Sequence, residues 1–371
     1  MSGVRYVGYL SEHTGYGQAA RDHVAVLAES GVAVGARSIL ISDGKTVIVP
    51  LDPDQYPSVA RLAEQAPPYE TVIVHTPPYG FEAARELGRR NVGVVAWETD
   101  TLPASWHAPV QLMDEIWVPS EFCLAPFRAV TSAPVCVIPH PVAVREPLER
   151  AFPGVPDDVF LFVSIFEWQD RKNPEGLVRA FLRAFSGRRD VALLLKVGLR
   201  VGGKPGTVLR SLHQWLSPMP WRSPPIYVLE GSETSTRVIA QLHARADAYV
   251  SLHRAEGFGL CMAEAMARGK PVIATGYSGN LTFMDSESAF LVDYDLVPIV
   301  QRLSSVQFFE RGMRWAEPRV DHAVEQLRSC VERVSLRERV AARGLARVKG
   351  VLAPRRVGEL MRARVTRPPE G

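Results

Sequence analysis

Short apolar runs alternate with longer amphipathic stretches along most of the chain. The runs are rich in Val, Ile and aromatic residues, which predicts strands. In the first part of the chain they are 4–10, 71–75, 92–97, 115–119 and 135–139. Between the first two, segment 18–31 places Ala19, His23 and Leu27 near one helical face and ends at Gly31, a typical helix C-cap. Strands that alternate with helices predict a parallel sheet.

A second series of the same kind follows and predicts a second α/β unit. Its expected strands are 159–164, 191–197, 225–231, 247–252 and 270–276, and its expected helices are 175–185, 208–216, 236–246 and 260–269. After Asp293 the pattern becomes helical, with no further strand expected. The expected helices there are 321–334, 337–348 and 355–365. The fold class is therefore α/β, with two Rossmann-like domains and C-terminal helices.

The length of 371 residues predicts two domains, since it exceeds the size at which a single core stops growing. The segment between Pro139 and Asp157 is rich in proline and charge, without periodicity, and is the expected linker. We expect an N-terminal domain over 1–145 and a C-terminal domain over 146–350. Residues 351–371 should form a helix that crosses back to the first domain and ends in a frayed tail.

Composition and charge narrow the possible functions. Hydrophobic residues make up 46% and charged residues 22%, as in ordinary globular proteins. A net charge of +3, without an RNA-binding signature, predicts no nucleic-acid partner. Arginines gather from Arg333 onward, and a solvated helical face is favoured there over peripheral contact with anionic lipid. Four scattered cysteines and no secretory segment predict a cytoplasmic protein, with peripheral contact at the inner membrane surface as the alternative.

Segment 253–276 contains the clearest chemistry. Gly257 and Gly259 allow a sharp turn and close approach to a ligand, and the helix predicted from Leu260 presents its positive end to an anion. Glu256 and Glu264 lie on the two sides of this phosphate-type site, where each could bind hydroxyl groups. The alternative is a surface Glu256 plus a weak helical ion pair of Glu264 with Arg268.

The string EGFGLCMAE, residues 256–264, resembles the signature of retaining glycosyltransferase family 4, of the glycogen synthase or glycosyltransferase group 1 type. This resemblance implies the GT-B fold, with two parallel sheets facing across an interdomain cleft. It also implies that Glu256 contacts hydroxyls of the donor sugar and Glu264 the ribose. The residues implied to bind sugar and diphosphate through the turn are Gly257, Phe258, Gly259, Leu260 and Cys261.

Arg171 and Lys172 follow the first strand of the second domain and precede a helix that starts at Pro174. A fixed cation there would stabilise a departing diphosphate, so both are candidate catalytic residues. Many members of the family have an arginine several residues earlier, where this chain has Phe166. Lys196 is a weaker candidate. The alternative makes Arg171 and Lys172 solvated loop charges.

Two features of the first domain also resemble the family. Gly15 and Gly17 are similar to its N-terminal glycine loop, which caps the donor phosphates; they form no GxGxxG fingerprint, which counts against a nicotinamide-dependent oxidoreductase. His75 ends an expected strand, and the resemblance places it near the transferred sugar. His140 resembles a hinge residue. Trp97 and Glu98 could line the acceptor site, the commoner outcome being a half-buried tryptophan.

The resemblance implies a retaining, metal-independent hexosyltransferase or related enzyme. A nucleotide-diphosphate sugar would be its donor, and a glycan, lipid-linked or small-molecule hydroxyl its acceptor, in glycan or glycoconjugate biosynthesis. No cofactor is expected, and no metal, because no His, Cys or Asp residues have metal-ligand spacing. The alternatives are another GT-B enzyme, such as a phosphorylase or a sugar-nucleotide epimerase, and a non-catalytic sugar-nucleotide-binding protein.

Overall fold

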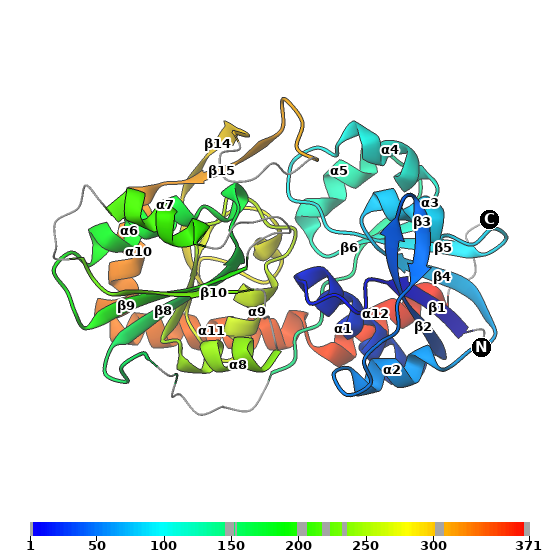
Figure 1. The fold of residues 1–371 in the computed structure, drawn as a ribbon, viewed down its shortest axis with the longest axis horizontal. Helices are drawn as coiled ribbons and strands as arrows, with labels where there is room; N and C mark the ends of the chain where they lie inside the picture. Colours follow the sequence, from blue (N-terminus) through cyan, green and yellow to red (C-terminus); the bar gives the residue numbers. More distant parts are fainter. Residues whose placement is uncertain are drawn as a thin grey trace. The chain divides into compact units, whose positions relative to one another are not determined.

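The chain divides into two compact units in the computed structural model (Figure 1). The first comprises Met1–Ala143 with Val351–Gly371, and the second Val144–Gly350. The structure describes residues 3–144, 152, 154–198, 206–216, 223–231, 236–300 and 308–366. The expected frayed tail, 367–371, lies outside these residues, as do residues 145–151 and 153 of the linker expected between Pro139 and Asp157.

A seven-stranded sheet forms the centre of the first unit, in the order β3-β2-β1-β4-β5-β6-β7. Only β3 is antiparallel to its neighbour. The strands are β1 (Gly3–Gly8), β2 (Val34–Ser42), β3 (Lys45–Ile48), β4 (Tyr69–His75), β5 (Arg90–Val94), β6 (Glu115–Val118) and β7 (Val135–Val137). The apolar runs did not predict β2 and β3, because Arg37 and Ser38 interrupt the pattern in β2 and β3 is mostly exposed.

Helices pack against this sheet. They are α1 (Gly15–Glu29), α2 (Pro57–Ala63), α3 (Phe81–Ala84), α4 (Ala104–Gln111), α5 (Leu124–Arg128) and α12 (Pro354–Val365), with 3-10 turns η1 (Pro78–Gly80) and η2 (Glu121–Cys123). Helix α12 comes from the far end of the chain, and its Val357 and Met361 are fully buried in the core of this unit. Arg364 of α12 also pairs with the buried Glu115 at 2.6 Å. The C-terminal helix is therefore an integral part of the first unit.

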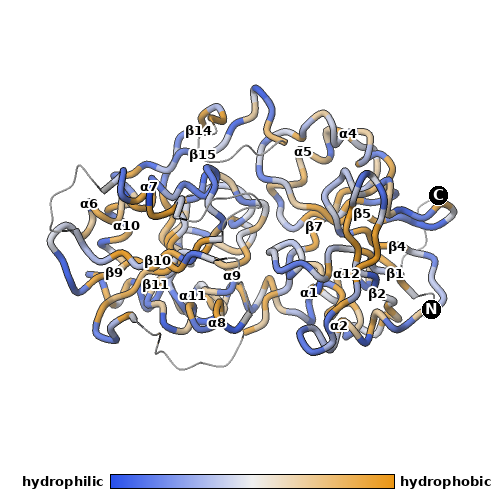
Figure 2. Tube along the Cα trace, viewed as in Figure 1, coloured by the Kyte–Doolittle hydropathy of each residue, from blue (hydrophilic) through white to orange (hydrophobic). Residues whose placement is uncertain are grey.

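The second unit contains an entirely parallel six-stranded sheet in the order β10-β9-β8-β11-β12-β13. Its strands are β8 (Phe160–Glu167), β9 (Val191–Gly198), β10 (Ile226–Glu230), β11 (Ala248–Ser251), β12 (Val272–Thr275) and β13 (Phe290–Val292). Numbered within the unit, this is the Rossmann order 3-2-1-4-5-6. Figure 2 shows the hydrophobic trace concentrated along these central strands. The predicted α/β class with two Rossmann-like units is confirmed.

The helices of the second unit supply the other half of its core. They are α6 (Pro174–Ala184), α7 (Thr207–Leu216), α8 (Thr236–Arg245), α9 (Leu260–Ala267), α10 (Val320–Glu332) and α11 (Val334–Val351), with 3-10 turns η3 (Asp170–Lys172) and η4 (Gly279–Thr282). Leu177, Val178 and Phe181 of α6 are buried against Phe162 of β8. Because α6 is anchored in this way, the η3 turn at its start has a fixed place beside the end of β8.

The expectation that no strand follows Asp293 is wrong. Strands β14 (Tyr294–Pro298) and β15 (Arg314–Pro318) form a separate antiparallel pair. Trp315 and Ala316 are buried, whereas β14 is largely exposed. Since both strands are short and end at proline, they lack the continuous apolar run that marks the strands of a parallel sheet.

We predict that Gly358→Ala destabilises the first unit. A Cβ at Gly358 would lie 2.5 Å from the carbonyl oxygen of Val26, so α12 would have to move away from α1. Such overpacking costs about 1–3 kcal/mol, which urea unfolding followed by circular dichroism measures.

Gly350→Ala is the matched control, because a Cβ there meets nothing within 4 Å and alanine favours a helix by about 1 kcal/mol. Equal stability of Gly358→Ala and wild type would contradict the close approach of α12 to α1.

Candidate functional site

The candidate site lies where the strand order of the second sheet reverses. Strands β8 and β11 are parallel neighbours, but the chain continues from β8 to β9 on one side of the pair and from β11 to β12 on the other. Open α/β sheets bind ligands outside the carboxyl ends of such a pair. The η3 turn follows β8, and His253–Glu256 follow β11. Topology alone therefore brings Arg171 and Lys172 to the edge that holds Glu256.

An ion cluster joins these segments. Lys172 Nζ forms a short hydrogen-bonded ion pair with Glu256 Oε1, and Arg171 Nη1 lies 3.2 Å from Oε2. The Arg171 guanidinium also donates to the carbonyl of Ala255 at 3.3 Å. The side chains of Arg171 and Lys172 are each 16% exposed and that of Glu256 10%, so the cluster is mostly shielded from water. Two cations face one carboxylate, which leaves a net positive charge suited to an anion.

Glu256 is ionised at neutral pH. Its burial by itself raises the pKa, but the charges of Lys172 and Arg171 outweigh this and hold the pKa at about 2. An ionised carboxylate accepts hydrogen bonds only, so Glu256 can bind hydroxyl groups of a ligand as an acceptor.

Arg254, which the sequence interpretation missed, holds the η3 turn in place. Its backbone N–H donates to the carbonyl of Arg171 at 2.7 Å and its Nη1 to the carbonyl of Asp170 at 2.6 Å. The same guanidinium forms a two-point pair with Glu317 of β15. Arg254 thus positions Arg171 and Lys172 by binding the backbone of the η3 turn, while Glu317 neutralises its own charge. Its only signal in the sequence was its place two residues before Glu256.

The loop after β12, residues 276–280, packs closely on the segment that contains Glu256. The Glu256 N–H donates to Ser278 Oγ, and the Gly279 N–H donates to the Glu256 carbonyl, each at 2.9 Å. A Cβ at Gly279 would lie 2.1 Å from the carbonyl oxygen of Gly257, so only glycine permits this approach. Ser278 adopts φ 77° and ψ −148°, a region that glycine alone enters readily. Backbone strain at this loop is a mark of a functional site.

The buried histidine at the end of β11 connects the same loops. Nε2 of His253 lies 3.2 Å from both the carbonyl of Tyr277 and Oδ1 of Asn280, and the His253 carbonyl accepts from Thr275 Oγ1 at 2.6 Å. Burial lowers the pKa of His253. The neutral ring therefore acts as a hydrogen-bonding connector between the strand ends.

Helix α9 begins at Leu260, as the sequence predicted. Its N-cap, Gly259, has φ 96°, and the first N–H groups of a helix have no partner within it. Phe258 is buried against Phe283, with ring centroids 5.0 Å apart. Burial raises the pKa of Cys261 to about 12, so it is a neutral thiol. Glu264 is 29% exposed, on the second turn of the helix.

Residues 157–306 match the family model described as Glycosyl transferases group 1. This part of the second unit is therefore similar to the group 1 glycosyl transferases. The matched residues span β8 to β14 and include every residue of the ion cluster and of the α9 turn. No curated protein matches the chain.

Solved structures match the whole chain at low identity and confirm the GT-B fold. HepE of Anabaena in complex with UDP and glucose is 14% identical, with a TM-score of 0.64 over 99% of this chain and 100% of HepE. Sucrose-phosphate synthase from Thermosynechococcus elongatus is 16% identical, with a TM-score of 0.69 over 98% of each chain. A glycosyltransferase from Rickettsia africae is 13% identical, with a TM-score of 0.68 over 98% of each chain.

Gly15 and Gly17, expected in a glycine loop, lie instead in the first turn of α1, because Thr14 caps the helix just before them. The Gly17 N–H donates to Thr14 Oγ1 at 3.2 Å, and a Cβ at Gly17 would lie 2.3 Å from the carbonyl oxygen of Glu12. Buried Arg21 donates to the carbonyls of Leu10 and Glu12, each at 2.7 Å. A Cβ at Gly15 would meet nothing within 4 Å. The Arg21 side chain therefore holds in place the residues that precede α1.

His75 ends β4, which lies beside β1 where the first sheet reverses its order. It is buried, and its Nδ1 lies 2.7 Å from the hydroxyl of Tyr6. The rings of His23 and His140 are 5.5 and 6.3 Å away. Burial lowers the pKa of all three histidines, that of His23 to about 4. His75 is thus a neutral hydrogen-bonding group in a cluster of imidazoles.

The weaker candidates have structural contacts. Trp97 is buried against Trp106 at 4.5 Å between centroids and donates to the Thr101 carbonyl, while Glu98 next to it is half-buried. Lys196 is 2% exposed and donates to the Gly231 carbonyl at 2.7 Å. Phe166 stacks on Trp168.

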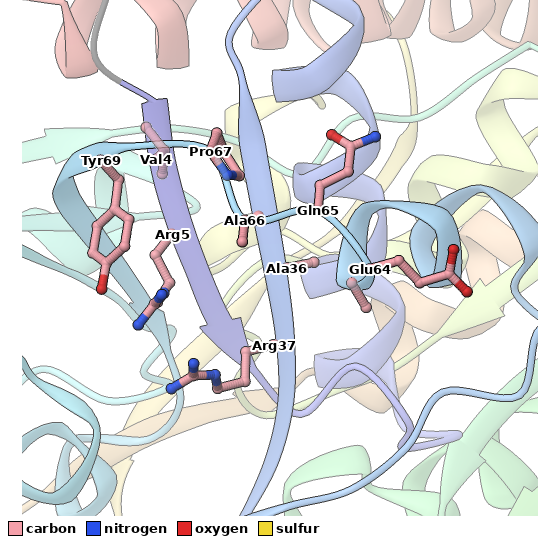
Figure 3. Close-up of a pocket in the computed structure, with 11 residues that line it drawn as sticks. Val4, Arg5, Ala36, Arg37, Glu64, Gln65, Ala66, Pro67 and Tyr69 are labelled. Carbon is pink, nitrogen blue, oxygen red and sulfur yellow. The ribbon is translucent and has the colours of Figure 1, made fainter.

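A cavity of about 160 Å³ lies at the amino-terminal ends of three strands of the first sheet (Figure 3). Val4, Gly35 and Tyr69, which line it, belong to the amino-terminal ends of β1, β2 and β4. Because ligands of this fold bind at carboxyl ends, the cavity is separate from the strand ends that hold His75.

Among the described residues, no helix is long and apolar enough to cross a membrane.

The histidine cluster predicts that the first unit loses stability in acid. The folded pKa of His23 is about 4, below the roughly 6.5 of an unfolded histidine, so the unfolded state binds protons first as the pH falls. Between pH 6.5 and 4, His23 therefore lowers the free energy of unfolding by up to about 1.4 kcal/mol per pH unit, which urea unfolding across that range measures. The lowered pKa values of His75 and His140 act in the same direction.

His23→Gln should reduce this pH dependence, and His13→Gln, at an exposed histidine, should leave it unchanged. A pH dependence that is the same in wild type and His23→Gln would refute the assignment.

Proposed function

We propose that the chain is a glycosyltransferase that moves a sugar from a nucleotide-diphosphate sugar to an acceptor hydroxyl, with retention of configuration and without a metal ion. The observation that supports this most is the pairing of Arg171 and Lys172 with Glu256 at the carboxyl ends of β8 and β11, where the strand order reverses. It combines an anion site with an acceptor of hydroxyl hydrogen bonds in a region similar to the group 1 glycosyl transferases.

The donor diphosphate would bind between the two cations and the start of α9. Backbone N–H groups from Phe258 to Cys261 and the positive end of the helix dipole favour negative charge there. Glu264, one to two turns further along α9, would accept hydrogen bonds from the ribose hydroxyls. Glu256 would accept from hydroxyls of the transferred sugar. HepE and the pneumococcal O-GlcNAc transferase GtfA, which share the fold at 14% and 16% identity, were solved in complexes that contain UDP.

Lys172 would act mainly in the transition state. When the bond between the anomeric carbon and the diphosphate oxygen breaks, its electron pair stays on the diphosphate, whose charge grows beside Lys172 and Arg171. The acceptor oxygen attacks the same face of the sugar and passes its proton to the departing phosphate oxygen. The bond broken, the bond formed and the transferred proton then balance without a covalent intermediate on Glu256. Glu256 remains a carboxylate that binds hydroxyl groups.

The first unit would supply the acceptor side. Gly15 and Gly17 would allow the start of α1 to approach the donor phosphates, and His75 would contact the transferred sugar as a neutral hydrogen-bonding group. The acceptor is a glycan, a lipid-linked sugar or a small molecule, in a cytoplasmic setting. Arg343 and Arg347 of α11 pair with Glu287 and Asp285, which favours a solvated face over lipid contact for these arginines.

We predict that one nucleoside diphosphate raises the melting temperature of the protein, with or without EDTA. The panel is UDP, GDP, ADP, TDP and CDP, measured by thermal shift. Glu264→Ala should weaken the stabilisation because the ribose loses its acceptor. Glu338→Ala, at an exposed position of α11, is the control and should respond as wild type does.

Each other outcome points to a different function. Stabilisation that EDTA removes would contradict metal independence. Stabilisation by no diphosphate would contradict a preformed donor site and favour a different role for the fold. Conversion of the sugar without an acceptor would favour the epimerase, and release of a sugar phosphate would favour the phosphorylase. Tight donor binding with no turnover across an acceptor panel would favour a non-catalytic binding protein.

We also predict that Lys172→Met lowers kcat by about 10²–10³-fold, the usual loss when one donor to a developing oxyanion is removed. Release of the diphosphate from its sugar donor provides the assay. Lys349→Met removes an exposed lysine of α11 and should leave kcat unchanged. A loss that appears only in KM would show that Lys172 binds the ground state and transition state equally.

A further inference from the structure

His243, near the end of α8, is a buried titratable group that the transfer chemistry above does not use. Its side chain is 1% exposed, and neither Nδ1 nor Nε2 has a hydrogen-bond partner among the described residues. Buried polar atoms almost always have a partner, and an unsatisfied buried donor destabilises a fold. An apolar side chain would avoid this cost, so a histidine at this position requires an explanation.

The elements around His243 hold its ring in place. Leu242, next to it on α8, is fully buried in the core of the second unit, and Arg245 anchors the end of the helix by donating to two backbone carbonyls just before β8. The ring of Tyr249 on β11 lies 5.5 Å away between centroids. The Tyr249 hydroxyl is itself fixed by the backbone of Ile165. The imidazole is therefore confined between rigid neighbours.

This confined ring lies against the carboxylate of Glu264. Nε2 of His243 is 3.5 Å from Oε2 of Glu264 but forms no hydrogen bond with it. Since N–H···O hydrogen bonds are about 2.7–3.2 Å long, an approach of about 0.5 Å would form one. With its proton on Nε2, a neutral imidazole donates from Nε2 and only accepts at Nδ1. The Glu264 side chain is 29% exposed, so it also has a side that a ligand can reach.

We propose that His243 is a positioning residue for the ribose-binding carboxylate. As the ribose hydroxyls donate to Glu264, Nε2 of His243 donates to Oε2 from the buried side, which fixes the carboxylate and leaves Oε1 to the ligand. A carboxylate held in this way loses less rotamer freedom when the ligand binds. The inference rests on the proposed function only in taking Glu264 as the ribose ligand, because it concerns donor binding and not transfer.

The experiment is isothermal titration calorimetry of the full chain with UDP, GDP, ADP, TDP and CDP, and with inorganic pyrophosphate, which has no ribose. His243→Met replaces the donor with an adaptable apolar side chain. It should weaken binding of the preferred nucleoside diphosphate about three- to tenfold, the usual effect of one hydrogen bond. Affinity for pyrophosphate should stay unchanged. His243→Gln, whose amide nitrogen can take the place of Nε2, should restore most of the affinity.

A double-mutant cycle shows whether the effect passes through the carboxylate. In a chain that already has Glu264→Ala, His243→Met should weaken binding no further, because the group that it positions is gone. His213→Met, at an exposed histidine of α7, is the matched control and should bind as wild type does. Circular dichroism checks that each variant is folded, and His243→Phe takes the place of His243→Met if the latter does not fold.

The outcomes separate this inference from the proposed function. Equal affinity of wild type and His243→Met for the nucleoside diphosphate would overturn the inference and leave the donor site intact. An equal loss for pyrophosphate, or a loss that persists with Glu264→Ala, would also overturn it, since His243 would then support α9 as a whole. A wild type that binds none of the five diphosphates would instead overturn the proposed donor site, and the inference with it.

Discussion

The candidate site depends on one buried, ionised carboxylate. Glu256 keeps its charge because Lys172 and Arg171 offset the cost of its burial. A mostly buried ion pair is weak evidence for stability, and removing one partner costs roughly 3–5 kcal/mol. Such an arrangement makes sense where charge is needed for binding. The surplus positive charge then has a function only when an anion arrives.

The loops around Glu256 form a closed set of mutual constraints. Arg254 fixes the η3 turn, Ser278 receives the Glu256 N–H, and Gly279 lies against Gly257. Each contact joins segments far apart in the sequence but adjacent at the carboxyl edge of the sheet. Backbone, rather than flexible side chains, therefore sets the positions of the charged groups. A site prepared in this way loses little freedom when a ligand binds.

The sequence was sufficient for the elements whose pattern is local. Most of the parallel strands and the start of α9 were predicted and are confirmed, and residues 157–306 match the predicted family. Two parallel strands were missed: β2, whose apolar run Arg37 and Ser38 interrupt, and β13, which has only three residues. Strands β14 and β15 were missed because they pair antiparallel outside the main sheet. The family 4 assignment, retention and the roles of His75 and Glu264 stay predictions. The support from Arg254 and Ser278 could not be predicted, because it arises from tertiary contacts between loops.

The path of the chain between the units has a consequence for how the protein is made. The core of the first unit includes Val357 and Met361 of α12, whereas the second unit occupies the chain between Val144 and Gly350. On the ribosome, all of the second unit is therefore synthesised before the last helix of the first. Domains generally fold as units during synthesis, from the N-terminus onward. Here the first unit is the first to be synthesised but the last to be completed. Its hydrophobic surface beside α1 therefore stays uncovered until α12 has been synthesised.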